Sequence, residues 1–157
     1  MQKITPFLWF DGRAEEAMNF YTSIFKNSKV GNVTRYGEAA PGPKGSVMSA
    51  TFQLDGLEFI ALNGGPMFTF SPAISFLVHC ETQQEVDELW AKLSEGGKTQ
   101  QCGWLQDRFG VSWQIVPTVL GRMLQDKDAE KSKRVMQAML TMTKLDIALL
   151  KQAYEQR

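Results

Sequence analysis

The sequence has few of the residues on which many kinds of site depend. Its 157 residues include one histidine and two cysteines. One histidine excludes any site that takes two histidines from a single chain, and two cysteines without a Cys-x-x-Cys spacing are typical of a reducing compartment. The 17 basic and 17 acidic side chains cancel, so no net charge attracts the chain to nucleic acid or to an anionic membrane.

Long apolar segments are also missing. No apolar run approaches the roughly 20 residues that a transmembrane helix needs, and the amino terminus lacks the small-residue cleavage site of a signal peptide. We therefore expect a cytoplasmic protein with neither membrane nor nucleic-acid partners. Apolar residues make up 43% of the chain and charged residues 22%, which is the balance of a chain that folds around its own core.

The first half of the chain has the pattern of a strand, a helix and three further strands. Apolar residues at spacings of three and four predict a helix over 13–25. A loop rich in proline and glycine is expected at 38–45, and Asp55-Gly56 is the dipeptide of a two-residue type I′ hairpin. The predicted strands are 3–10, 30–36, 47–54 and 57–62.

The second half repeats this order at an offset of 69 residues. Phe7-Leu8 matches Phe76-Leu77, and Glu16-Ala17 matches Glu85-Val86, without a gap. The matching pattern predicts a helix over 81–94 that ends at Gly96-Gly97. Its predicted strands are 73–80, 99–106 and 111–116. The chain therefore reads as two βαβββ modules, at about 1–66 and 72–117.

A third region, 118–157, has helical patterns and no convincing strand. A short helix is expected around Val119 to Leu124, and Asp128 is placed to cap a second helix. Thr143 and Asp146 have the spacing of a capping box and open a predicted last helix through Leu145, Leu149 and Tyr154. Four of the eight methionines lie in this tail, which favours packing against the sheet or against a partner chain.

Three motifs resemble one known branch of proteins. They are Thr5-Pro6-Phe7-Leu8-Trp9-Phe10-Asp11-Gly12, Leu62-Asn63-Gly64-Gly65-Pro66, and Cys102-Gly103-Trp104 continuing to Val111-Ser112-Trp113-Gln114-Ile115-Val116-Pro117. Together they resemble the PhnB-like branch of the vicinal oxygen chelate superfamily, which includes glyoxalase I and bleomycin-resistance proteins. This branch is often labelled 3-demethylubiquinone-9 3-methyltransferase-like, and the resemblance covers nearly the whole chain, including the tail.

The resemblance implies an α+β fold in which the two modules face each other around a shared cleft, with 64–72 linking them. It also implies a homodimer, because the superfamily commonly pairs modules between chains. Four strand positions commonly supply metal ligands in that superfamily. Here they fall at Thr5 or Pro6, at Phe59 with Glu58 beside it, at Ile74 and at Gln114. One amide and one carboxylate are a poor donor set, so we expect no built-in metal and no cofactor.

The cleft implied by the resemblance would be lined by apolar and aromatic side chains. Phe7, Trp9, Phe59, Phe76 and Gln114 are the candidate ligand-binding residues, and no catalytic residue is assigned. His79 is expected on the outer face, away from its neighbour Cys80, and both cysteines are expected to be packing residues. Further candidates at the cleft mouth are Arg35, Tyr36 and the 63–70 loop. The inner-face set is Thr5, Phe7, Trp9, Phe59, Ala61, Ile74, Phe76, Val78, Ser112, Gln114 and Val116.

These expectations favour a protein that binds a small apolar or aromatic molecule without a metal. An enzyme of the glyoxalase or dioxygenase superfamily is the alternative, and an assembly scaffold is a third. Methyl transfer is a weaker alternative, because a common methyltransferase carries a glycine-rich turn after its first strand, within an alternating βα sheet. Gly64-Gly65 precedes a proline in a loop, and Gly96-Gly97 follows a helix instead of opening one.

Overall fold

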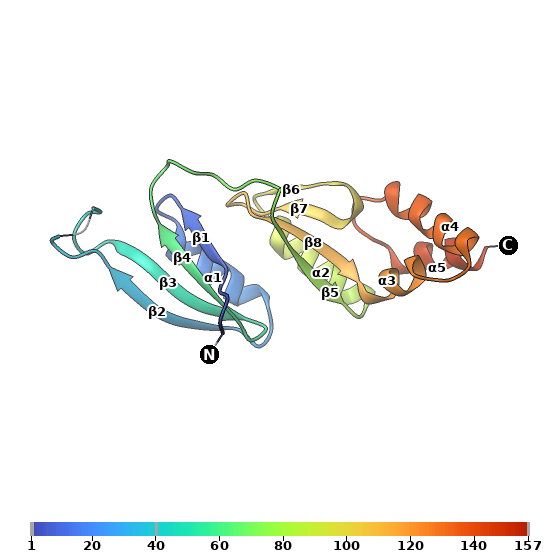
Figure 1. Ribbon diagram of the computed structural model, residues 1–157, viewed down its shortest axis with the longest axis horizontal. Helices are drawn as coiled ribbons and strands as arrows, with labels where there is room; N and C mark the ends of the chain where they lie inside the picture. The colour runs from blue at the N-terminus through green and yellow to red at the C-terminus, as the bar shows by residue number, and fades with distance from the viewer. Residues whose placement is uncertain (1, 40, 157) are drawn as a thin grey trace. The chain divides into compact units, whose positions relative to one another are not determined.

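The computed structural model describes residues 2–39 and 41–156. The chain divides into two compact units, Met1–Phe70 and Ser71–Arg157. Each unit contains one four-stranded mixed sheet with a helix packed on one face, and the second unit also contains the tail helices (Figure 1). Within the described residues, no helix is both long enough and apolar enough to cross a membrane.

Module 1 is the sheet of the first unit with its helix. Strand β1 (Phe7–Phe10) leads into α1 (Ala14–Ile24), and β2 (Lys29–Arg35), β3 (Val47–Leu54) and β4 (Leu57–Asn63) follow. The strand order is β1-β4-β3-β2, with β1 parallel to β4 and the other pairs antiparallel. Positive φ angles at Asp55 (49°) and Gly56 (80°) show the predicted two-residue turn between β3 and β4.

The core of module 1 lies between the sheet and α1. Buried Ala17, Met18 and Tyr21 of the helix face buried side chains of alternate strand positions. The ring of Tyr21 stacks on Phe52 at 6.1 Å, and Phe52 stacks on Phe59 at 5.4 Å. This aromatic column fixes which face of each strand belongs to the core.

Module 2 has the same topology, with a shorter second and third strand in chain order. It contains β5 (Ser75–Cys80), α2 (Gln83–Ser94), β6 (Lys98–Thr99), a 3-10 turn η1 (Gln101–Gly103), β7 (Trp104–Gln106) and β8 (Ser112–Pro117). The order β5-β8-β7-β6 repeats that of module 1, and β5 is parallel to β8. The predicted single strand at 99–106 is wrong, because η1 interrupts it and Cys102 takes a left-handed conformation (φ 61°).

The tail forms three helices, α3 (Thr118–Leu124), α4 (Ala129–Leu140) and α5 (Ile147–Glu155). Asp128 caps α4 as predicted, because its carboxylate accepts hydrogen bonds from the amides of Glu130 and Lys131. The predicted role of Thr143 as a cap is wrong. Asp146 itself is the N-cap of α5 and accepts from the Leu149 amide at 3.1 Å. The tail helices bury a second cluster of Leu120, Met123, Val135, Leu145 and Leu150.

Candidate functional site

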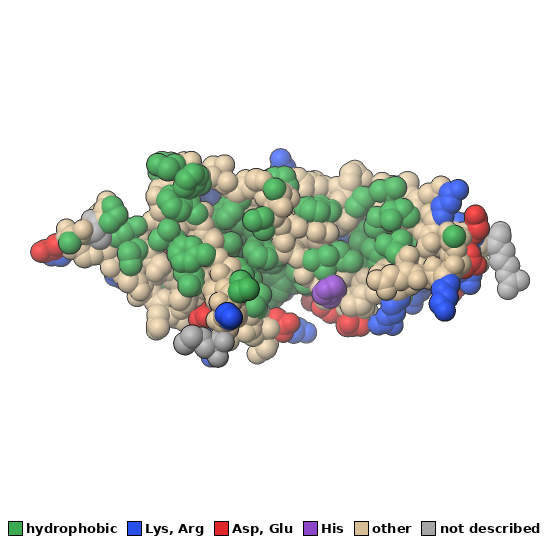
Figure 2. Space-filling view, viewed as in Figure 1, with side chains coloured by type: hydrophobic (Ala, Val, Ile, Leu, Met, Phe, Trp, Pro, Cys, Tyr) green, Lys and Arg blue, Asp and Glu red, His purple; other side chains and the backbone are tan. Residues whose placement is uncertain are grey.

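The sheet of module 1 has one face that α1 does not cover, which we call its open face. Strand alternation and register place Phe7 and Trp9 there, beside Ile60 and Leu62 of the neighbouring strand. Phe7 is 58% exposed. Figure 2 shows a group of hydrophobic side chains (green) over β1 and β4 in this view. The open face thus has the apolar and aromatic character that the sequence predicts for Phe7 and Trp9.

The assignment of Phe59 and Ala61 to this face is wrong. Both side chains are buried on the α1 side, where Phe59 stacks on Phe52. The register pairs Phe52 with Phe59 and Ala50 with Ala61, which places all four residues on the core face. Glu58, Ile60 and Leu62 are therefore the β4 residues that belong to the open face.

The same error of one residue affects β5 in module 2. Phe76 and Val78 pair with Trp113 and Ile115, which are buried on the α2 side, and the rings of Phe76 and Trp113 lie 5.3 Å apart. The open face of this sheet instead carries Ser75, Leu77 and His79, so the expectation that His79 lies on the outer face is wrong for the same reason. Figure 2 shows the chain's one histidine (purple), His79, at the surface.

Gln114 lies on the open face of module 2, where the sequence places it. Its side-chain amide donates a hydrogen bond to the Ser75 hydroxyl at 2.9 Å, so the amide group has a fixed protein partner. Trp104 pairs with Gln114 across β7 and β8 and shares this face. The neighbouring Ser112 hydroxyl is buried and has no hydrogen-bond partner among the described residues. This face therefore combines polar groups with the ring of Trp104.

The residues at the four family metal positions do not fit a resident metal. Pro6 and Ile74 have no side-chain donor atom, Thr5, the alternative at the first position, offers only a neutral hydroxyl, and Ile74 is 74% exposed. Gln114 offers one amide oxygen and Glu58 one carboxylate, which is too few charged donors for a closed divalent site. Among residues 2–39 and 41–156, no group of three or more His, Cys, Asp or Glu side chains is placed to hold an ion.

The two cysteines lie in different surroundings. Cys80 is fully buried on the α2 side, opposite His79, as predicted from strand alternation. Burial, with a smaller contribution from Glu85 and Glu81, raises the pKa of the Cys80 thiol to about 12, so it is not a nucleophile at neutral pH. Cys102 is half-buried in η1, and its amide donates to the Met142 carbonyl at 2.8 Å.

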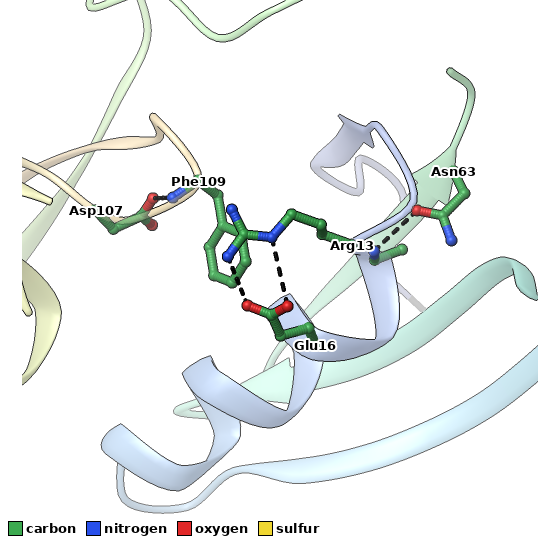
Figure 3. A network of polar contacts seen from close by, with 6 residues as sticks. Arg13, Glu16, Asn63, Asp107 and Phe109 are labelled. Carbon is green, nitrogen blue, oxygen red and sulfur yellow. Dashed lines mark hydrogen bonds and ion pairs between the residues drawn. The ribbon is translucent and has the colours of Figure 1, made fainter. Parts of the chain in front are cut away.

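A separate pocket lies at the carboxyl ends of β1 and β4 in module 1. Its volume is about 510 Å³. Asn63 connects its walls: its side-chain oxygen accepts from the Ala14 amide at 2.8 Å, its amide group donates to the Val47 carbonyl at 3.2 Å, and its own carbonyl accepts from the Tyr36 hydroxyl at 2.6 Å. Figure 3 shows the contact of Asn63 with the first turn of α1, beside the Arg13–Glu16 ion pair.

Two glycines bring backbone against the aromatic rings around this pocket. A Cβ at Gly42 would lie 2.4 Å from the Tyr36 ring, and one at Gly64 would lie 2.5 Å from the Trp9 ring. The Trp9 indole also donates to the Gly65 carbonyl at 2.8 Å. Tyr36 and the 63–70 loop are among the candidates predicted from the sequence, whereas Asp11 and Glu15 are not. The pocket is lined by Asp11, Gly12, Glu15, Tyr36, Pro41, Gly42, Pro43, Ser46, Val47, Asn63, Gly64 and Gly65.

Residues 2–116 match the family model described as 3-demethylubiquinone-9 3-methyltransferase. A PhnB protein from Bacillus cereus has a similar structure, with 45% sequence identity, a TM-score of 0.69, and coverage of 74% of this chain and all of that one. The chain belongs to this 3-demethylubiquinone-9 3-methyltransferase-like (PhnB) family. No curated protein matches the sequence.

More distant structures share the fold alone. Protein PA1353 from Pseudomonas aeruginosa is 22% identical, with a TM-score of 0.62 over 74% of this chain and 98% of that one. The fosfomycin resistance protein FosX from Listeria monocytogenes is 14% identical, with a TM-score of 0.59 over 80% of this chain and 98% of that one. The helical tail lies outside the range matched by the family model, which ends at residue 116, so the extension of the resemblance through the tail stays a prediction.

Proposed function

We propose that this PhnB-like protein binds a small apolar or aromatic molecule on the open faces of its sheets, without a resident metal. The observation that carries the proposal is the exposure of Phe7 next to Trp9, Ile60 and Leu62. Apolar side chains that gather on a sheet face, with the core on the opposite face, are typical of a binding surface. The inter-module cleft expected from the sequence remains the proposed place of binding.

The size of the expected effect follows from burial of the aromatic rings. Covering apolar surface contributes roughly 25 cal/mol per Å², so a ligand that covers most of an exposed phenylalanine ring gains on the order of 2 kcal/mol from that contact. Binding also costs translational and rotational freedom. A site of this kind therefore depends on several rings and aliphatic groups together, and removing one of them weakens binding without abolishing it.

Reaction chemistry is the second candidate, because the family belongs to a superfamily that contains enzymes. Glu58 and His79 are the titratable side chains that alternation places on the open faces of β4 and β5. A carboxylate and an imidazole are the two common acid–base groups of enzymes. We place methyl transfer behind both candidates, since β1 is followed by the short Asp11-Gly12 turn and each sheet is mixed.

We also propose a cytoplasmic homodimer. The tail helices leave Met136, Leu140 and Leu149 exposed, and these side chains are apolar surface that a second chain would bury. Sedimentation velocity at tens of micromolar protein tests this, with removal of 128–157 as the comparison. A wild-type monomer at that concentration would contradict the proposed dimer.

Two measurements test the binding proposal. Native mass spectrometry of protein purified from cells detects a bound mass and the subunit count together. Calorimetric titration with 2-naphthol then measures binding to the wild type and to Phe7→Ala, which we expect to bind at least about fivefold more weakly. Leu57→Ala is the matched control, because Leu57 is also exposed and apolar but alternates onto the other face. Equal affinity of the Phe7→Ala and Leu57→Ala variants would overturn the proposal.

A further inference from the structure

The pocket at the ends of β1 and β4 has an uncompensated charge in its lining. Asp11 and Glu15 are its two ionisable carboxylates, and its lining contains no lysine, arginine or histidine. Neither carboxylate makes an ion pair or a hydrogen bond with any other described residue. The lining therefore presents negative charge to whatever enters the pocket.

Three basic side chains next to the pocket segments in sequence have other partners, and one of them, Arg35, donates to the Gly45 carbonyl at 3.1 Å. Lys44 lies in the same connection as the pocket wall and pairs with Glu38 at 2.7 Å. Arg13 lies next to the pocket in sequence and pairs with Glu16 at 2.6 Å. These pairs leave the carboxylates of Asp11 and Glu15 to a ligand or to water.

The remaining walls have the character of a small-molecule site. The volume of about 510 Å³ lies within the range of roughly 300–1,000 Å³ that ligand pockets occupy. Tyr36 supplies an aromatic ring, Pro41 and Pro43 supply apolar surface, and Ser46 with the 63–65 backbone supplies hydrogen-bonding groups. Asn63 holds three of these walls together, so little ordering is needed when a ligand binds.

We propose that this pocket is a second binding site, selective for a small organic cation with an ammonium group and an apolar body. Asp11 and Glu15 pair with the ammonium, whose three donors suit carboxylate acceptors. The ring of Tyr36 adds a cation–π or apolar contact, depending on which part of the ligand it meets. The site is distinct from the Phe7 surface of the proposed function, so either proposal can fail without the other.

The experiment separates charge from shape with two probes of nearly equal size. Phenethylammonium chloride and neutral 2-phenylethanol are titrated into 15N-labelled full-length protein at constant ionic strength, and backbone amide shifts are followed. We expect saturable shifts with the ammonium at Gly12, Glu15, Ser46, Gly64 and Gly65. We expect at least about tenfold weaker binding of the alcohol, which corresponds to the loss of a charge pair worth about 1.4 kcal/mol.

Isosteric variants test the two carboxylates. Glu15→Gln and Asp11→Asn each keep the side-chain shape, and each should weaken phenethylammonium binding at least about threefold. Glu88→Gln is the matched control, since it removes an exposed carboxylate from α2 and should leave binding unchanged. Thermal unfolding of each variant confirms that the fold is kept.

Three results would overturn the proposal. One is equal binding of the ammonium and the alcohol, which would show an apolar site without charge selectivity. Another is an equal loss of affinity in Glu88→Gln and Glu15→Gln, which would show a general electrostatic effect. The third is the absence of saturable shifts at the pocket amides, which would show that the cavity holds only solvent.

Discussion

The two modules share one topology but use the connection between their second and third strands differently. In module 1, β2 and β3 have 7 and 8 residues and the segment 36–46 joins them. In module 2, β6 and β7 have 2 and 3 residues, and η1 lies between them. With the same strand order, the second and third strands are therefore joined by a long connection in module 1 and by a tight turn in module 2.

Each connection has a different partner. The long connection of module 1 packs on itself, with Gly42 against the Tyr36 ring, and forms one wall of the pocket. The turn of module 2 binds the tail instead, because the amides of Cys102 and Gly103 donate to the carbonyls of Met142 and Thr143 at 2.8 Å each. A duplicated fold can therefore give a pocket in one copy and an anchor for added helices in the other.

The largest expected effect comes from breaking the tail anchor of module 2. Leu145 is fully buried in the tail cluster and lies next to Gly103, where a Cβ would be 3.0 Å from its side chain. Leu145→Ala should lower the free energy of unfolding by about 2–5 kcal/mol, because it leaves a cavity that the surrounding helices cannot fill. Urea unfolding followed by circular dichroism measures this loss.

Gln137→Ala is the control for that change. Gln137 is exposed in α4 and is not one of the apolar side chains proposed for the dimer, so its truncation should alter the free energy of unfolding by less than about 0.5 kcal/mol. Hydrogen exchange should also accelerate at the Cys102 and Gly103 amides in Leu145→Ala. Unchanged protection of these two amides would show that the tail does not anchor the turn.

The second largest expected loss of stability is at the hairpin turn of module 2, which differs from the hairpin turn of module 1 in its buried carboxylate. The turn between β7 and β8 depends on the buried carboxylate of Asp107, which accepts from the Phe109 amide, the Val111 amide and the Trp113 indole at 2.9–3.0 Å (Figure 3 shows the Phe109 contact). Asp107→Ala leaves these donors without that acceptor, so we expect a loss on the order of 2–3 kcal/mol. Asp107→Asn, which keeps one acceptor oxygen, should lose less.

Chemical denaturation of these two Asp107 variants, with near-ultraviolet circular dichroism of the tryptophans, checks the result. The alanine variant should also change the tryptophan signal, because Trp113 loses its indole acceptor. Equal stability of Asp107→Ala and the wild type would mean that water replaces the carboxylate. The turn between β7 and β8 would then need no buried acidic side chain, like the turn between β3 and β4 in module 1.

Much of the fold could be predicted because its signals are local. Asp55-Gly56 specifies a turn with two positive φ angles, and Asp128 caps its helix as its position before the apolar pattern predicts. The strand faces of β4 and β5 could not be predicted in the same way. Phe59-Ile60-Ala61-Leu62 and Phe76-Leu77-Val78 are continuous apolar runs without alternation, so a shift of one residue exchanges the two faces.

The site could be predicted only in part. Phe7, Trp9 and Gln114 lie on the faces where the sequence places them. Polar and apolar residues alternate over Ser112-Trp113-Gln114-Ile115 of β8, whereas β1 is a continuous apolar run and its face is not specified by alternation. The pocket was harder to find, since its walls come from segments near 11–15, 36–47 and 63–65 that only the folded sheet brings together. In the sequence, Asp11 belongs to a turn and Glu15 to the first turn of a helix, and neither position indicates a pocket. The hydrogen bond from the Ala14 amide to Asn63 is what holds this segment at the end of β4.

A smaller effect should appear at the hairpin turn of module 1. Gly56 has a φ of 80°, and a side chain there takes a left-handed conformation that costs about 1–2 kcal/mol. Gly56→Ala should therefore lower the free energy of unfolding by roughly that amount. Gly121→Ala is the matched control: Gly121 is in α3 with open space around its Cβ position, and the change should stabilise by about 0.5–1 kcal/mol. Destabilisation of similar size in both variants, measured in urea, would argue against a turn-specific cause.

The smallest expected effect lies in the tail, which only module 2 carries. The Tyr154 hydroxyl donates a short hydrogen bond to the Asp126 carboxylate. This hydrogen bond is the largest cause of two pKa shifts: it lowers the pKa of Asp126 and raises the pKa of Tyr154. The Lys131 ammonium lies 5.0 Å from the centre of the Tyr154 ring. Both groups are accessible to solvent, so their hydrogen bond contributes little to the free energy of unfolding.

The contribution of the Tyr154–Asp126 hydrogen bond to stability should be lost at both acid and alkaline pH. Because the pKa of Asp126 is lowered in the folded state, its contribution is present above the ordinary carboxylate value near 4 and is lost as the pH falls through the lowered value. Because the pKa of Tyr154 is raised, its contribution is present below about 10 and is lost as the pH rises through the raised value. Tyr154→Phe should thus lower the melting temperature slightly between about pH 5 and 9 and match the wild type at both extremes. A difference that stays constant from acid to alkaline pH would show that the ring packs in the tail without its hydrogen bond contributing.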